Sequence, residues 1–292
     1  MATKRPDLAS AEYTSTGYLH ELLAPTLKRL QKGGTLYYTP LSSGVTAQTN
    51  RAALGAVTAN TKASASTSFG CSEILSRQRM SYDEVEQGYD DLLHAELEMA
   101  FDGKNAVETV LETAIATALV GTGASPVDLT SSDEVIETIS ADAADLMDKA
   151  PDCRIALVVS QKVFNLLKSN ATVTDRMKNV GIAVGEGGDP RTVTAAQLAA
   201  VLGIDEVLVG KSSIWGATKA ALVALPHKEK AQNQEAQLAR TLVYQTSDSA
   251  DIPFTCESYE DNDAKGYVVD TLAYAQVKLL NAGLSKAYTL FA

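Results

Sequence analysis

The residues that come closest to a chemical motif are Gly210, Lys211 and Ser212, which look like the end of a phosphate-binding loop. Such a loop needs a further glycine five residues before Gly210, and this chain has Asp205 at that position. Residues 206–209 also form a β-prone run instead of a flexible loop of backbone amide donors. The pattern therefore predicts a simple turn at the end of a strand.

A second glycine-rich segment lies at residues 181–190 and contains Gly185 and Glu186. It lacks the strand-then-helix setting of a dinucleotide-binding fingerprint, and Glu186 places a carboxylate where a phosphate would sit. We interpret the segment as a loop. A cytosolic α/β enzyme that uses this loop together with the turn at Gly210 remains an alternative from a different functional class.

Metal and nucleophile chemistry have weak support in the sequence. His94 and Glu98 have the i, i+4 spacing of two ligands on one helix face, but the chain has only three histidines and no second one at ligand spacing. The odd number of cysteines and the lack of a CxxC pair favour reduced thiols: Cys71, Cys153 and Cys256. We therefore predict no catalytic residue, no metal and no cofactor, and expect a protein that is not an enzyme.

Composition narrows the functional classes further. The 292 residues carry a net charge of -11 and a pI near 4.8, which argues against a dedicated nucleic-acid binder with a basic face. A protein that merely encloses nucleic acid is not excluded by this charge. No run of 18 uncharged apolar residues occurs and the N-terminus lacks an apolar signal-peptide core, so we expect neither a membrane span nor export by a standard signal peptide.

The element that must organise the chain is a long helix predicted over residues 81–121. Apolar residues recur at helical i, i+3, i+4, i+7 spacing, from Val85 through Leu97 and Val107 to Leu119. An unbroken helix here would be about 60 Å long. Gly103 lies near its middle, so a bend is expected there, and it is a natural place to flex if the protein changes shape.

Before this helix the sequence predicts two different regions. Residues 1–33 read as an arm with a short amphipathic helix over 17–32, interrupted by Pro25. Residues 34–80 are rich in Thr, Ser, Ala and Gly and have β-prone pieces at 35–39 and 66–75. A projecting two-stranded hairpin that packs on a neighbouring subunit and a disordered loop both fit this composition.

After the long helix, the chain mixes helices and strands. A capping box at residues 131–134 predicts a helix that ends near Lys149. Ser160 and Thr194 are expected to cap two further helices, and Gly203 is expected to end the second of them. Strands are predicted over these ranges: 154–159, 206–209, 220–225, 238–244, 253–259, 266–274 and 277–280. The elements are segregated instead of alternating as βαβ units, so the predicted fold class is α+β.

In its order of elements the chain resembles the major capsid proteins of tailed bacteriophages, which have the Hong Kong 97 type of capsid fold. Three segments carry the resemblance. Residues 90–123 are similar to the spine helix and its exit turn, residues 154–167 to the entry into the axial domain, and residues 197–210 to a helix-to-strand passage in that domain. These patterns are degenerate, so the resemblance rests on their order and spacing.

The resemblance implies a domain organisation in five parts. Residues 1–33 would be an N-terminal arm, 34–80 an extended β-hairpin loop, 81–149 a peripheral domain with the spine helix, 150–248 an axial domain, and 249–292 the return strands of the peripheral domain. The extended loop would lap over an adjacent subunit, and the loop at 181–190 would lie near the symmetry axis of a hexamer or pentamer.

The implied function is that of a major capsid protein, which self-assembles into an icosahedral shell around double-stranded DNA in a bacterial host's cytoplasm and ends in the virion. The implied partners are copies of the chain, a separate scaffolding protein, a portal, a possible decoration protein, and the packaged DNA through non-specific contact. An encapsulin-like nanocompartment with protein cargo is the nearest alternative. The candidates for contact between subunits are Leu19, Leu23, Arg51, Lys62, Arg77, Arg79, Gly185 and Glu186.

Some relatives join subunits through an isopeptide bond between a lysine of the extended loop and an asparagine of the peripheral domain. Lys62 is the only lysine of this loop and Asn281 lies in the closing region, but no motif pairs them with a catalytic glutamate. We therefore expect non-covalent contact between subunits.

Overall fold

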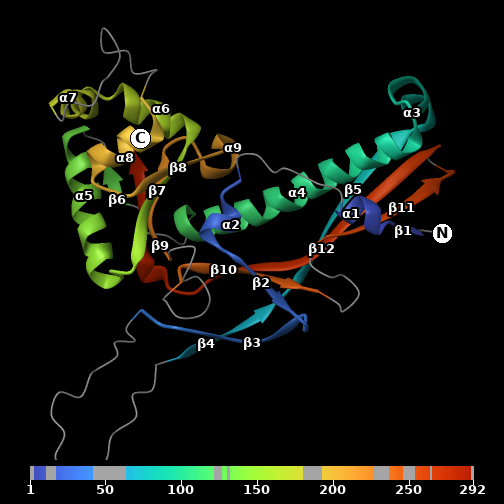
Figure 1. Cartoon of the computed structure of the whole chain (residues 1–292), viewed down its shortest axis with the longest axis horizontal. Helices are drawn as coiled ribbons and strands as arrows, with labels where there is room; N and C mark the ends of the chain where they lie inside the picture. Colours follow the sequence, from blue (N-terminus) through green and yellow to red (C-terminus); the bar gives the residue numbers. More distant parts are fainter. Residues whose placement is uncertain are drawn as a thin grey trace, which may run out of the picture.

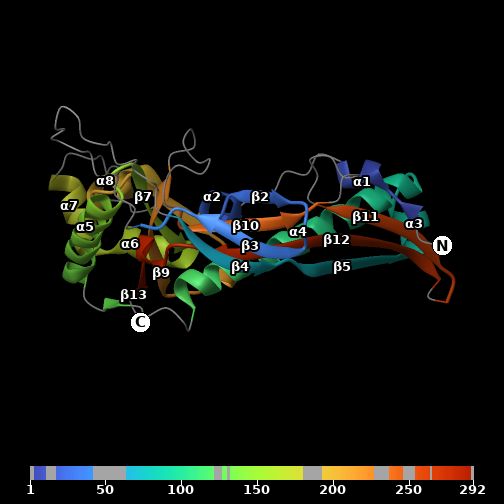
Figure 2. The ribbon, with the colours of Figure 1, turned by 90° about the horizontal axis from the view of Figure 1, so that it is seen from below.

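The computed structural model describes residues 3–10, 18–41, 64–121, 127–129, 132–179, 193–226, 237–245, 254–263 and 265–290. The described part is elongated and thin, with the long helix α4 along its length and a group of helices at one end (Figures 1 and 2). The described chain forms three sheets, of six, five and two strands. The fold is therefore a mixed α+β architecture, as the sequence predicted.

The long helix is confirmed in its main part but begins later than predicted. A seven-residue helix, α3 (Tyr82–Gly88), precedes the 29-residue α4 (Leu92–Val120). The chain breaks between them because Tyr89 is extended and Asp91 caps α4, its side chain accepting from the His94 N–H at 2.8 Å. The expectation of one rod over 81–121 is therefore wrong at its N-terminal end.

Helix α4 continues through Gly103 without interruption. Gly103 is buried, and a Cβ added there would lie 2.7 Å from the Cβ of Thr271 on strand β12. The glycine therefore allows close packing of helix on sheet. This contact gives a physical reason for a glycine here that needs no flexing.

The six-stranded sheet packs against α4. Its central strand is β12 (Gly266–Leu279), which replaces the two separate strands predicted over 266–274 and 277–280. Alternate residues of β12 face the helix, and Thr271 and Ala273 are buried there. The other strands of this sheet are β1 (Thr3–Lys4), β2 (Thr26–Arg29), β5 (Ser72–Ser81), β10 (Ala239–Tyr244) and β11 (Thr255–Asp261).

The five-stranded sheet forms the core of the helical end of the molecule, in the order β6-β13-β9-β7-β8. Its central strands β7 and β9 are almost wholly buried, in agreement with their continuous apolar sequences. The strands are β6 (Val127–Leu129), β7 (Cys153–Ser160), β8 (Glu206–Gly210), β9 (Lys219–Pro226) and β13 (Ser285–Leu290). A 3-10 turn at Ala282–Leu284 leads into β13, a strand that the sequence did not predict.

Helices surround this second sheet (Figure 1). The predicted caps are confirmed: Ser160 accepts from the Val163 N–H, Thr194 forms a capping box with Gln197, and Gly203 ends its helix at φ 71°. The helix α7 was not predicted, because its sequence is mostly polar. The helices are α5 (Ser132–Lys149), α6 (Gln161–Ser169), α7 (Ala171–Asn179), α8 (Ala195–Leu202) and α9 (Ser212–Trp215).

The two larger sheets each take strands from distant parts of the chain. The five-stranded sheet takes β6 and β13 from outside residues 150–248, and α5 packs on β7 and β9 of that sheet. Strand β10, inside that range, pairs with β12 of the six-stranded sheet. The chain therefore passes between the two sheets several times, and the division into five parts stays a prediction.

The N-terminal arm differs from its predicted helix over 17–32. Within the described residues 18–32, α2 (His20–Leu23) is the one helical segment, and residues 26–29 form β2, which pairs parallel with β10. Proline ends the helix because it has no N–H to donate. A second short helix, α1 (Pro6–Ser10), lies on α4 further along the molecule (Figure 2).

The two-stranded sheet is the base of the predicted hairpin. Strands β3 (Gly33–Tyr38) and β4 (Ala65–Gly70) pair antiparallel, from Gly33 opposite Gly70 to Tyr38 opposite Ala65. The predicted single run over 66–75 divides at Cys71, where the chain leaves β3 and continues as β5 beside β12. The hairpin prediction is confirmed at its base, and the middle of the loop lies outside the described residues.

Candidate functional site

No cluster of His, Cys, Asp and Glu that could hold a metal ion occurs in the described part of the chain. His94 pairs with Asp91, and Glu98 accepts from the hydroxyl of Tyr89, so the two suggested ligands point to different partners. All three cysteines are free thiols. Burial raises the pKa of Cys71 and of Cys256, which keeps both thiols protonated and unreactive.

The turn at Gly210 is confirmed as a strand end, and it has no room for a phosphate. Strand β8 ends at Gly210, and a Cβ added there would lie 2.5 Å from the indole nitrogen of Trp215. The buried indole covers the turn that a phosphate would need to approach. The other half of the enzyme alternative, the loop with Gly185 and Glu186, lies outside the described residues. Among the helices that the structure describes, none has the length and apolarity to cross a membrane.

In place of such a site, the described residues show two sets of contacts that hold the N-terminal arm and the hairpin to the rest of the subunit. We call each set a joint. The first joint is a line of buried charged side chains along α4, which sequence reasoning missed. Four residues spaced by four or eight positions fall on one side of the helix, and their exposed fractions are at most 7%: Glu96, Lys104, Glu108 and Glu112. The sequence pattern that could have revealed these buried charges is the occurrence of charged residues at helical spacing within an apolar stripe.

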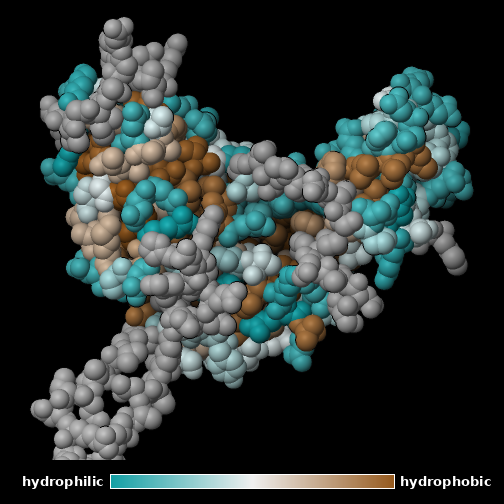
Figure 3. Space-filling view, in the orientation of Figure 1, coloured by the Kyte–Doolittle hydropathy of each residue, from teal (hydrophilic) through white to brown (hydrophobic). Residues whose placement is uncertain are grey.

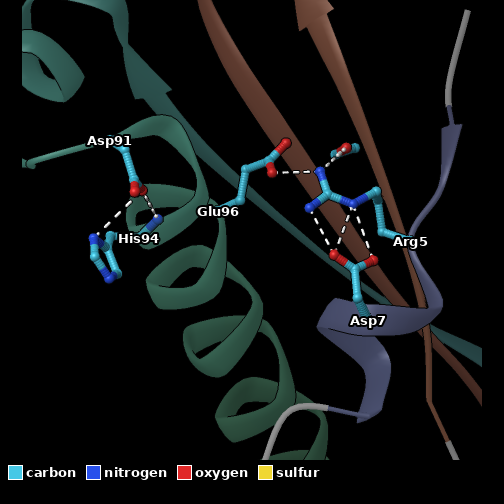
Figure 4. Close-up of polar contacts among 6 residues, drawn as sticks. Arg5, Asp7, Asp91, His94 and Glu96 are labelled. Carbon is cyan, nitrogen blue, oxygen red and sulfur yellow. Dashed lines mark hydrogen bonds and ion pairs between the residues drawn. The ribbon is translucent and has the colours of Figure 1, made fainter.

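At one end of this line, Glu96 binds the N-terminal arm (Figure 4). Arg5 donates to Glu96 and, through its Nε and Nη2, to Asp7 at 3.0 and 2.8 Å. The hydrogen bond from Arg5 holds the pKa of Asp7 below its usual range, and the same bond raises the pKa of Arg5. Figure 4 shows Arg5 between the arm and α4, so this guanidinium joins the two elements.

In the middle of the line, Lys104 donates to the backbone carbonyl of Leu8 at 2.9 Å. The lysine is 1% exposed and Leu8 is fully buried, so both ends of this bond are shielded from water. Burial lowers the pKa of Lys104. The bond ties α1 to α4 at a second point.

At the other end, Glu112 joins three elements. Its carboxylate accepts from the backbone N–H of Leu19 at 2.8 Å and from the indole N–H of Trp215 at 2.5 Å. The Nδ1 of His20 lies 3.8 Å from the same carboxylate. Burial raises the pKa of Glu112 and lowers that of His20. Glu112 therefore connects α2, α4 and α9.

This joint changes the interpretation of two predicted contact residues. Leu19 and Leu23 are 7% and 1% exposed and belong to the main hydrophobic core of the chain itself. Their side chains are therefore not available to a neighbouring subunit. The apolar spacing that suggested a contact surface reflects packing of α2 onto α4.

The second joint is the base of the hairpin. Asn281 accepts from the Leu41 N–H at 3.2 Å and donates to the carbonyls of Thr39 and Gln237 at 3.2 and 2.8 Å. The N–H of Gly70 donates to the side chain of Gln276 at 3.0 Å. Asn281 thus joins the chain after β3 to the chain before β10, and Lys62 lies outside the described residues.

The two faces of the hairpin differ. Leu36 is 2% exposed and packs against the sheet with Leu242, whereas the neighbouring Tyr37 is 71% exposed. Leu30, in the turn before the hairpin, is 84% exposed. The hairpin therefore rests on the six-stranded sheet by one face and presents aromatic and aliphatic side chains on the other.

The remaining predicted contact residues are placed as follows. Arg77 on β5 forms a bidentate pair with Asp270 at 2.7 and 2.8 Å, so its guanidinium is engaged within the chain although it is exposed. Arg79 lies two residues further along the same exposed face of β5. Arg51, Lys62, Gly185 and Glu186 lie outside the described residues. The structure therefore brings only Arg77 and Arg79 together on one surface.

Apolar and polar surface alternate on the face shown in Figure 3, with hydrophobic surface gathered over the helical end. Exposed hydrophobic side chains also occur on α4, β5 and the turn after β2, at Val110, Leu75 and Leu30. Scattered residues of this kind do not define one binding cleft. Single exposed hydrophobic residues of this kind are normal on protein surfaces and by themselves mark no contact.

Comparison with known proteins identifies the fold. No family model matches the sequence, and no curated protein matches it. Solved structures do match. A phage-related protein from Bordetella bronchiseptica RB50 is similar over 100% of this chain and 98% of its own, with a TM-score of 0.70 at 14% identity.

Two further structures extend this likeness. The capsid protein of the cyanophage P-SCSP1u is similar over 96% of this chain and 91% of its own, with a TM-score of 0.59 at 11% identity. A virus-like particle protein from Pyrococcus furiosus is similar over 97% of this chain and 95% of its own, with a TM-score of 0.54 at 10% identity. The chain has the Hong Kong 97 type of capsid fold, which confirms the fold expected from the resemblance.

Proposed function

We propose that this protein is the major capsid protein of a tailed bacteriophage and assembles into a closed icosahedral shell around double-stranded DNA. The observation that carries the proposal is the likeness to two solved phage capsid structures, each of which covers 96% of this chain. Assembly would use many weak contacts in rings of five and six copies, which become strong together through effective concentration.

The further partners are part of the same proposal. A separate scaffolding protein would guide assembly, a portal would admit the DNA, and a decoration protein is an optional addition. Assembly would take place in the bacterial cytoplasm. The net charge of -11 supports only non-specific contact with DNA, because an acidic inner surface would repel phosphates.

Negative-stain electron microscopy of the purified protein tests the proposal directly. We expect closed shells or rings of five or six subunits, and a sedimentation coefficient far above that of a 30.9 kDa monomer. A protein that remains monomeric or dimeric at all concentrations, and that binds nucleotides saturably, would refute the shell and favour the enzyme alternative.

An encapsulin-like nanocompartment is a second candidate, because the virus-like particle protein from Pyrococcus furiosus shares the fold. The contents of purified shells distinguish the two. Nuclease-protected double-stranded DNA in particles from the natural source supports the capsid. A co-purifying protein cargo without DNA supports the nanocompartment.

A further inference from the structure

A pocket lies at the base of the hairpin, between strand β2, the turn that follows it, and strands β3 and β4. Its volume of about 370 Å³ is that of a small-molecule site, and it opens to solvent. Its lining includes Arg29, Gln31, Gly34 and Phe69, and none of its lining residues is an aspartate or a glutamate. The pocket therefore has room for a small ligand and no carboxylate that would repel an anion.

Arg29 is the charged side chain on which the site depends. Its backbone is fixed at the end of β2, where its carbonyl accepts from the Gln245 N–H at 3.0 Å. The side chain is half-buried, and its shielded Nε has no hydrogen-bond partner within the described residues. An N–H that is shielded from water and unpaired is rare and unfavourable, so it calls for an explanation. An acceptor brought by a ligand supplies that explanation.

Phe69 forms an aromatic wall of the pocket. It lies on β4 directly opposite Gly34 of β3 and packs on the buried cluster of Leu36 and Leu242. The guanidinium of Arg29 lies 5.6 Å from the centre of the Phe69 ring. A cation–π contact uses the face of the ring and leaves the in-plane N–H donors of a guanidinium available. The pocket therefore offers an aromatic surface beside a cationic donor.

Gly34 keeps this pocket open. A Cβ added to Gly34 would lie 3.5 Å from the Cε1 of Phe69 and 3.6 Å from the Oε1 of Gln31, so a side chain would fill the space between these groups. The backbone does not require a glycine there, because Gly34 lies within a strand and its φ is outside the left-handed region. A substitution can therefore close the space without disturbing the strand.

The sequence around the pocket also lacks acidic residues. Residues 22–72 contain no aspartate or glutamate, in a protein of net charge -11. Lys28 lines the pocket as well, but it has an interaction within the chain, so we assign it no role. An anion that approaches the pocket therefore meets no carboxylate from this stretch of the chain.

We propose that the pocket at the base of the hairpin binds a small oxyanion, a phosphate monoester or a carboxylate, that carries an aromatic or other apolar group. A rotation of the Arg29 guanidinium toward the pocket pairs its Nε and one Nη with two oxygens of the ligand, the side-on geometry that arginine forms with such groups. The apolar group packs on Phe69, and the exposed Gln31 and Thr35 offer polar contacts. Because the lining comes from β2, β3 and β4, the ligand would hold the hairpin to the six-stranded sheet.

Ligand-observed NMR titrations of the full chain with phenyl phosphate test the site. Inorganic phosphate and phenol are the comparison probes, because each carries one half of that ligand. We expect saturable binding of phenyl phosphate that is at least tenfold tighter than the binding of either half. Benzoate, titrated in parallel, shows which of the two oxyanions binds more tightly.

Two variants remove different parts of the site. Arg29→Lys keeps the positive charge but loses the fork of donors, and Gly34→Val fills the space beside Phe69 while leaving Arg29 in place. Each should weaken the binding of phenyl phosphate at least tenfold. Arg176→Lys is the matched control and should leave binding unchanged, since Arg176 is exposed on α7, outside the pocket. Circular dichroism of each variant verifies that it is folded.

Limited proteolysis measures the consequence for the hairpin. Phenyl phosphate should slow cleavage of the hairpin severalfold in the wild type, because a ligand that binds only the folded site stabilises it. The same probe should have no effect on cleavage of Gly34→Val.

The outcomes separate this site from the proposed shell. Folded wild-type protein that shows no saturable binding of phenyl phosphate or benzoate up to millimolar concentrations overturns the site. So do Arg29→Lys and Gly34→Val variants that bind phenyl phosphate as tightly as the wild type. The pocket is formed within one subunit, so protein that binds the probe but forms no shells refutes the shell alone. Shells that bind none of the probes refute the site alone.

Discussion

Replacement of Glu112 by alanine should destabilise the subunit by about 2–4 kcal/mol. The substitution leaves two buried donors, the indole N–H of Trp215 and the backbone N–H of Leu19, without their acceptor. An unsatisfied buried donor costs about 1–3 kcal/mol, so two would cost about 2–6 kcal/mol. The lower part of that range is expected because the variant no longer buries a carboxylate, whose burial is itself unfavourable.

Equilibrium unfolding in urea at low protein concentration, followed by circular dichroism, measures this loss. Trp215 is the only tryptophan of the chain, so its fluorescence reports separately on whether the joint at Glu112 has opened. Glu98→Ala is the control, since it removes an exposed carboxylate from the same helix and should change the free energy of unfolding by less than about 1 kcal/mol. Equal effects of the two substitutions, or an unchanged Trp215 emission in Glu112→Ala, would refute the role assigned to Glu112.

Four further predictions concern the packing at Gly103, the base of the hairpin, and the buried titratable groups Glu112 and His20. Gly103→Ala should lower the free energy of unfolding by about 1–2 kcal/mol in urea, because crowding against Thr271 exceeds the gain in helix propensity; a stabilised variant would contradict the close packing. Asn281→Ala should make the hairpin several-fold more sensitive to limited proteolysis, since the two hydrogen bonds to Thr39 and Leu41 that anchor the chain after β3 are lost; unchanged cleavage would show that the strands alone hold it. Burial raises the pKa of Glu112 above its ordinary 4.5, so the contribution of Glu112 to stability should be lost as the pH rises from 4.5 through the folded-state pKa. In a pH series of urea titrations, the free energy of unfolding should therefore fall less for Glu112→Gln than for the wild type. Burial lowers the pKa of His20, so the contribution of His20 to stability is present above pH 6.5 and is lost as the pH falls through the folded-state pKa. In the same pH series of urea titrations, His20→Gln should not show this loss of stability.

Local signals in the sequence were enough to predict many elements. The helix α8 was bounded correctly because Thr194 and Gly203 act through their immediate neighbours, by a capping hydrogen bond and by a left-handed conformation. Strand β7 was recognisable from a continuous apolar run. The same reasoning failed where partners are distant in sequence, as at β13, which pairs with β9 more than 60 residues earlier.

The joints were harder to predict than the elements. Glu112 stands within an apolar stripe of α4, and its partners Leu19 and Trp215 are about a hundred residues away on either side. The spacing of residues along the sequence shows on which face of the helix Glu112 lies. It does not show whether another part of the chain packs on that face. For the same reason, the sequence could not separate a leucine that packs within the chain, such as Leu23, from one that contacts a neighbour.

The location of the buried charges bears on which parts of the subunit are free to make contacts. Arg5, Lys104 and Glu112 fix both described parts of the N-terminal arm to α4, so those parts belong to the body of the subunit. The exposed Leu30 lines the pocket at the base of the hairpin, and Tyr37 is exposed on strand β3 of the same hairpin. A neighbouring subunit that covers these side chains would bury apolar surface, and apolar burial supplies affinity that exposed ion pairs alone do not. We accordingly expect the hairpin base, and not the arm, to carry the contact between neighbouring subunits.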